Sequence, residues 1–141
     1  MIVSIAKDFW WEMSHRLPFH DGPCRNVHGH TYKLRLELTG TPDETGILLD
    51  YYHIQEVVQP VLALFDHSFL CDENDSLMIG FLRENGFKYY IMKKNSTSEN
   101  ISELLGELLV PKFKQFGNLE AMEVKIYETA DVYAAARFDL K

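Results

Sequence analysis

Three stretches of the chain alternate between apolar and polar residues, which is the pattern of a β-strand with one buried face. They span residues 2–15, 28–39 and 121–128, and residues 132–138 predict a shorter fourth strand. In the second stretch, one face carries His28, His30, Tyr32, Leu34, Leu36 and Leu38. Clusters rich in Gly and Pro separate the strands and predict turns.

Two other stretches repeat apolar residues at helical spacing. Asp50 is a candidate N-cap for the first helix, which Pro60 should kink or split because proline lacks an N–H group. Ser96 and Glu99 fit a capping box that begins the second helix. We also expect a short helix around residues 77–83 and a short strand over residues 88–93.

Hairpin connections dominate this order of elements. We therefore predict one α+β domain over residues 1–141, with a largely antiparallel sheet and both long helices on one face. The chain has 141 residues, of which 46% are apolar, and this is enough to bury a core. No internal repeat or linker divides it.

Charge and composition exclude several classes of function. The chain has 14 basic and 21 acidic residues, and a net charge of −7 argues against non-specific binding to nucleic acid or anionic membranes. No apolar run is long enough for a transmembrane helix, and Lys7 and Asp8 do not fit a signal peptide. With two cysteines, a disulfide scaffold is not expected. We expect a reduced, cytoplasmic protein.

Four polar residues stand where the alternation calls for apolar ones: His15, His28, His30 and Glu128. The i, i+2 spacing of His28 and His30 places both rings on one face of a strand, about 6.5–7 Å apart along the backbone. His15 projects from the same face of the other strand. Three neutral imidazoles with one open position are the layout of a catalytic zinc site. The alternative is three hydrogen-bonded core histidines.

Other residues could supply chemistry to such a site. Cys24 precedes His28 by four residues, and a nearby cation would favour its thiolate as base or nucleophile. It could instead be a plain loop thiol, or a fourth ligand that closes the zinc site. Asp66 could orient His67 for proton transfer, or both could be surface residues. Glu128 could accept two parallel N–H donors of a ligand, or reach solvent.

Six short segments together resemble the 6-pyruvoyl-tetrahydropterin synthase / 6-carboxy-tetrahydropterin synthase family. They occur in family order: Ser14-His15-Arg16-Leu17-Pro18, Cys24-Arg25-Asn26-Val27-His28-Gly29-His30-Thr31-Tyr32, Leu49-Asp50-Tyr51, Phe65-Asp66-His67, Thr97-Ser98-Glu99-Asn100-Ile101 and Tyr127-Glu128-Thr129. The resemblance implies the tunnelling fold, with a four-stranded antiparallel sheet and two helices on one face. It also implies that three subunits close a β-barrel, that two trimers form a homohexamer, and that active sites lie between subunits.

The resemblance further implies a role for each candidate residue. Zn²⁺ would be held by His15, His28 and His30, with Cys24 as the base. The pair Asp66 and His67 would come from a neighbouring subunit and assist proton transfer. Glu128 would anchor the pterin. The implied substrate is 7,8-dihydroneopterin triphosphate.

The C-x3-H-G-H spacing is closer to the 6-carboxy-tetrahydropterin synthases of queuosine (7-deazaguanine) biosynthesis than to the pyruvoyl-forming type. The expected activity is therefore a carbon–carbon lyase that releases acetaldehyde and triphosphate. A pyruvoyl-forming synthase, a zinc hydrolase independent of Cys24 and a non-catalytic zinc-binding assembly protein are the alternatives. Two features depart from the family: residues 72–95 are longer, and Ser96 stands where proline is common.

Overall fold

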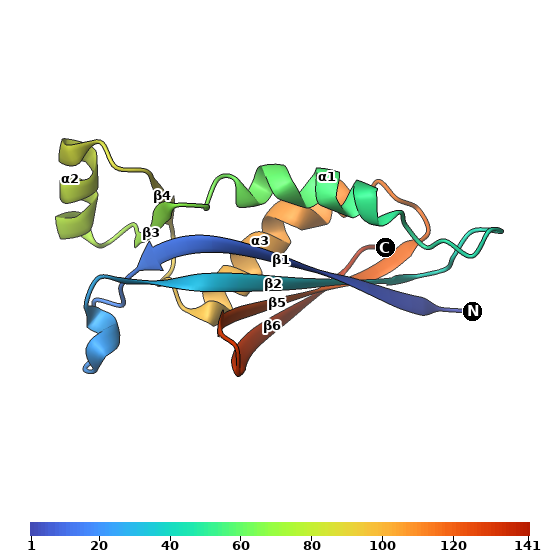
Figure 1. Ribbon diagram of the computed structural model, residues 1–141, viewed down its shortest axis with the longest axis horizontal. Helices are drawn as coiled ribbons and strands as arrows, with labels where there is room; N and C mark the ends of the chain where they lie inside the picture. The colour runs from blue at the N-terminus through green and yellow to red at the C-terminus, as the bar shows by residue number, and fades with distance from the viewer.

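A six-stranded sheet is the scaffold of the computed structural model, which describes residues 1–141 (Figure 1). Its strand order is β4-β3-β1-β2-β5-β6. In chain order the elements are β1 (Val3–His15), the 3₁₀ turn η1 (Pro23–Arg25), β2 (His28–Gly40), α1 (Tyr51–Leu62), β3 (Ser68–Asp72), α2 (Ser76–Asn85), β4 (Tyr89–Met92), α3 (Ser98–Phe113), β5 (Leu119–Thr129) and β6 (Val132–Asp139). The predicted α+β class is confirmed.

The four long strands form a continuous antiparallel ribbon, as the alternation predicts. β1 and β2 pair without a register shift from Val3↔Gly40 to His15↔His28. One face of this ribbon is buried under α1 and α3, and its apolar residues join those helices in the main core (Figure 1). The prediction that both long helices lie on one face is confirmed. None of the helices is long and apolar enough to span a membrane.

The predicted four-stranded sheet is wrong, because two short strands extend it to six. β3 pairs in parallel with β1, and β4 pairs in parallel with β3. The first four residues of β3 are all buried, so this strand has no polar alternation by which a sequence pattern could reveal it. The strand predicted over residues 88–93 is present as β4, and the short helix predicted around residues 77–83 is α2.

The helix ends follow local hydrogen bonds. Asp50 caps α1, since its carboxylate accepts from the backbone N–H of Tyr52 at 2.9 Å. Pro60 lies in the last turn of α1 and does not split the helix, which continues to Leu62. The prediction of Ser96 as the cap of α3 is wrong. Thr97 caps it by accepting from Asn100 N–H, and this leaves the Ser96 side chain free for another contact.

Candidate metal and substrate site

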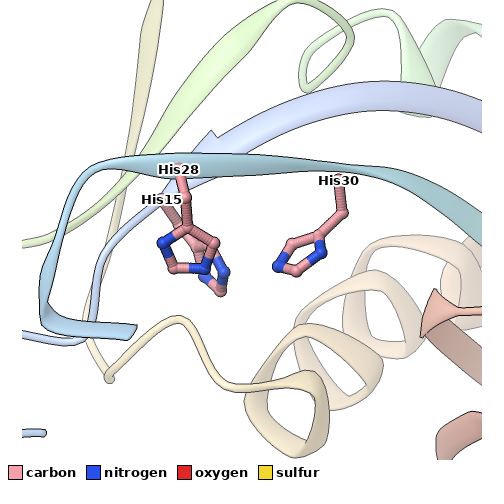
Figure 2. Close-up of side chains that lie close together, drawn as sticks. All are labelled: His15, His28 and His30. Carbon is pink, nitrogen blue, oxygen red and sulfur yellow. The ribbon is translucent and has the colours of Figure 1, made fainter. Parts of the chain in front are cut away.

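Three histidines converge at one end of the β1–β2 ribbon (Figure 2). His15 ends β1 and pairs with His28, the first residue of β2, while His30 pairs with Met13. Because the register is unshifted along the ribbon, all three rings take the face that carries the core. One ring nitrogen from each lies within 4.8 Å of the other two, as sequence parity predicts.

Backbone carbonyls fix the orientation of two of these rings. His15 Nδ1 lies 2.8 Å from the carbonyl oxygen of Ser96, and His28 Nδ1 lies 2.7 Å from that of Asn26. A carbonyl only accepts, so each Nδ1 carries the proton and donates it. Each Nε2 is therefore unprotonated and carries a lone pair. Such outer hydrogen bonds are typical of metal-binding histidines.

The cluster fits a metal ion better than it fits a set of satisfied core histidines. Burial lowers the pKa of His15 and of His30, which favours the neutral imidazole that a metal requires. His30 Nε2 is buried and has no hydrogen-bond partner. Leaving such an atom unpaired costs free energy, and an ion shared by three nitrogens would remove that cost. Three histidine nitrogens with an open position suit zinc.

Glu128 joins the cluster from a third strand. Its two carboxylate oxygens lie 3.9 Å from His15 Nε2 and His30 Nε2. The β5–β6 pairing has an irregularity between Tyr127 and Thr129, and such a bulge re-aims the side chain beside it. Glu128 continues the buried row of β5, as predicted, and remains one-quarter exposed. A ligand can therefore reach its carboxylate.

Cys24 lies in η1, within the loop that joins the two histidine-bearing strands. The backbone N–H of Leu17 donates to the Cys24 carbonyl at 2.9 Å, which holds the loop closed at this end of the sheet. The thiol is partly exposed and is not one of the three converging donors. The arrangement is that of a three-nitrogen site with a cysteine in the adjoining loop.

Asp66 and His67 contact each other and do not belong to the three-histidine cluster. Asp66 Oδ1 accepts from His67 Nδ1 at 3.0 Å and from the backbone N–H of Glu12 at 3.1 Å. The hydrogen bond from Glu12 lowers the pKa of Asp66. His67 borders an open cavity of about 450 Å³, whose lining also includes Glu12, Thr31 and His30. The pair is not among the residues whose donor atoms converge in the three-histidine cluster.

Sequence reasoning missed four residues that hold this site together. Ser96 supports His15, and Tyr32 places its hydroxyl 3.3 Å from His15 Nε2. The Lys88 ammonium donates to the carbonyls of Ala63 and Asp66, each at 2.7 Å. Asp75, the cap of α2, is buried and binds Arg16 through two hydrogen bonds at 2.7 and 2.8 Å. Of these four residues, only Tyr32 could have been found from the sequence pattern, because it has the same strand parity as His28 and His30.

Arg16 and Lys88 also show what the longer segment over residues 72–95 does. Asp75 of this segment fixes Arg16, the residue after His15, and Lys88 fixes the turn that carries Asp66. The segment therefore contacts both the residue that follows His15 and the turn that carries Asp66.

Fold and site together define an α+β protein with a three-histidine cluster, able to hold a metal, at one end of its sheet. The family model described as 6-pyruvoyl tetrahydropterin synthase matches residues 4–138. The chain therefore belongs to the 6-pyruvoyl tetrahydropterin synthase family.

Named relatives cover nearly all of the chain. A protein of Haemophilus influenzae named 6-carboxy-5,6,7,8-tetrahydropterin synthase is 31% identical over 91% of this chain and 94% of its own length. One of Rickettsia felis with the same name is 32% identical over 94% of this chain and 98% of its own. The solved 6-pyruvoyl tetrahydropterin synthase of Caenorhabditis elegans superposes with a TM-score of 0.72 at 24% identity, covering 99% of this chain and 97% of that one. This last likeness shows the fold.

Proposed function

We propose that the protein is a zinc-dependent 6-carboxy-5,6,7,8-tetrahydropterin synthase. It converts 7,8-dihydroneopterin triphosphate and water into 6-carboxy-5,6,7,8-tetrahydropterin, acetaldehyde and triphosphate. The observation that carries the proposal is the convergence of one ring nitrogen from each of three histidines beside Glu128. The names of the relatives and the C-x3-H-G-H spacing favour the carboxy product over the pyruvoyl product. The reaction belongs to the 7-deazaguanine (queuosine) pathway of the cytoplasm.

His15, His28 and His30 would hold the ion through one ring nitrogen each. When bound, zinc supplies Lewis-acid polarisation that acidifies the C–H and O–H groups of the substrate side chain. Cys24, as a thiolate, removes a proton from that side chain. Glu128 accepts the paired N–H donors of the pterin ring and orients it toward the histidines.

Asp66 and His67 act as a proton relay. Asp66 accepts from His67 Nδ1, so His67 Nε2 keeps a lone pair that can take up and return a proton. Because the pair is not among the converging donors of its own chain, we assign it to the site of a neighbouring subunit in a homohexamer built from two trimers.

The overall chemistry needs no redox cofactor. Loss of triphosphate and tautomerisation bring the ring to the tetrahydro level, and the oxidation change stays within the substrate. Water adds to the first side-chain carbon, which is then at the ketone level. Cleavage of the bond to the second carbon leaves the first carbon as the carboxyl group, and the electron pair of that bond takes up a proton, so the other two carbons leave as acetaldehyde.

The decisive experiment incubates the purified protein with 7,8-dihydroneopterin triphosphate and identifies the products. Acetaldehyde with 6-carboxy-tetrahydropterin supports the proposal, whereas 6-pyruvoyl-tetrahydropterin without acetaldehyde supports the pyruvoyl-forming alternative. No pterin product would refute both. Cys24→Ala should keep the metal and lose turnover; if the variant stays active, the base is another group, as in a hydrolase that uses water.

A non-catalytic assembly protein is the remaining alternative. It requires Cys24 as a fourth ligand, so X-ray absorption would show sulfur in the metal shell. Three nitrogens without sulfur would exclude that closed site.

A further inference from the structure

Tyr32 is a fully buried residue whose hydroxyl points into the three-histidine cluster. It follows His30 by two residues on β2 and takes the same face of the strand. Its hydroxyl lies 3.3 Å from His15 Nε2, one of the nitrogens that face the centre. Because His15 Nδ1 carries the ring proton, Nε2 is the acceptor and Tyr32 is the donor.

The phenol ring is held in this orientation from two sides. Trp11, its cross-strand neighbour on β1, stacks on the ring with centroids 5.4 Å apart and an interplanar angle of 19°. His30 meets the ring edge-on at 5.3 Å. The hydroxyl is therefore pre-positioned at the cluster and does not depend on solvent for its direction.

Metal binding would take away the acceptor of this hydroxyl. His15 Nε2 has a single lone pair, which cannot serve an ion and the Tyr32 O–H together. A buried donor without an acceptor is costly, so the hydroxyl must turn to another oxygen. Glu128 is the nearby carboxylate, and in the proposed function its oxygens are taken by the pterin. The remaining acceptor is an oxygen of the bound substrate.

We propose that Tyr32 donates a hydrogen bond to the substrate side-chain oxygen beside His15, and is a further catalytic residue. This inference rests on the proposed function for the identity of the substrate. When Cys24 removes a proton from the side chain, negative charge develops on that oxygen. A fixed donor in a buried site stabilises such charge without reorganising.

Tyr32→Phe tests the proposal because it removes one oxygen atom and keeps the stacked ring. Acetohydroxamate, a small oxygen ligand, serves as the probe of the cobalt-substituted protein, and its binding is followed by the visible absorption of the metal. We expect its affinity to fall about tenfold in the variant. With the pterin substrate, kcat should fall by roughly 10–100-fold while KM stays within about threefold.

Two controls keep these outcomes distinct. Tyr90→Phe alters a tyrosine of β4 that packs on Phe65, and should leave hydroxamate affinity and kcat unchanged. Metal affinity, measured by competition with a chelator, should not weaken in Tyr32→Phe, because the variant only loses a competitor for His15 Nε2.

If Tyr32→Phe binds hydroxamate as tightly as the wild type, the proposal is overturned. A metal affinity weakened more than about tenfold would also overturn it, because Tyr32 would then act by supporting the histidines. A rise in KM at unchanged kcat would point to action through Glu128 and would also overturn it. Failure of the wild type to turn over the pterin refutes the proposed function alone, since the hydroxamate comparison still reports the Tyr32 donor.

Discussion

The three-histidine cluster and the Asp66–His67 turn differ in how completely one chain builds them. The side chain of His15 is 1% exposed, whereas that of His67 is 77% exposed. The cluster is held by an unshifted ribbon and by carbonyls that fix its rings. The turn is held by Glu12 and Lys88, and His67 adopts a positive φ of 57° that non-glycine residues rarely take.

This difference indicates different tasks. A metal site needs fixed ligands before the ion arrives, and one chain supplies them. A proton relay needs access to the substrate, and the exposed side chain of His67 leaves its ring open to one. The strained backbone at His67 is expected where the surrounding contacts define a functional conformation. In the proposed hexamer, the cluster would form one half of a site, and the turn would complete the site of a neighbouring subunit.

The largest effect should come from removing a ligand of the cluster. His28→Ala should weaken metal binding by at least about 100-fold and abolish turnover, because two imidazoles cannot replace three. Elemental analysis after dialysis measures the occupancy. His53→Ala, an exposed histidine of α1, is the matched control and should retain the metal. Full occupancy in His28→Ala would refute the ligand set.

Changing the turn should leave the metal in place. His67→Gln should reduce kcat by about 10²–10⁴-fold, the range for loss of a positioned acid–base group, with unchanged metal content. Mixed oligomers sharpen the comparison. Random mixing of His28→Ala and His67→Gln subunits should restore about a quarter of the sites if each site takes its halves from two subunits. If mixtures of the two variants recover no activity, the three-histidine cluster and the Asp66–His67 turn of one site belong to the same subunit.

A smaller effect is expected from the support of the turn. Lys88→Met removes both hydrogen bonds to the carbonyls of Ala63 and Asp66, and should lower kcat a few-fold without loss of metal. Lys94→Met is the control, since Lys94 pairs with Glu103 at the surface instead. Equal activity of the two variants would show that the turn does not need Lys88.

The smallest effect should be a pH dependence of the metal-free protein. Burial lowers the pKa of His15 and of His30 below their usual 6.5, so the unfolded chain takes up protons there before the folded chain does. The stability that these two neutral histidines contribute is therefore fully present above pH 6.5, and it should decline as the pH falls below that value. Melting temperatures of chelator-treated protein measure this decline. His30→Gln should show a shallower decline, and an equally steep one would assign the effect to other groups.

Much of the cluster could be predicted because strand parity is a local property. The alternation in residues 2–15 and 28–39 already placed His15, His28 and His30 on one face, and the antiparallel pairing only had to align them. The same reasoning could not find β3, whose residues are buried without alternation. It also misassigned Ser96, because its hydrogen bond to His15 joins residues 81 positions apart.

Residue spacing along the chain was enough to predict the two-faced strands, the amphipathic helices and the polar residues that interrupt the buried rows. The three-dimensional structure was needed to show that Tyr32 points at His15. It was also needed to show that residues 72–95 bind Arg16 and the carbonyl of Asp66 through Asp75 and Lys88. Contacts of that kind depend on how separate elements pack, and residue spacing does not encode the side on which a turn emerges from a sheet.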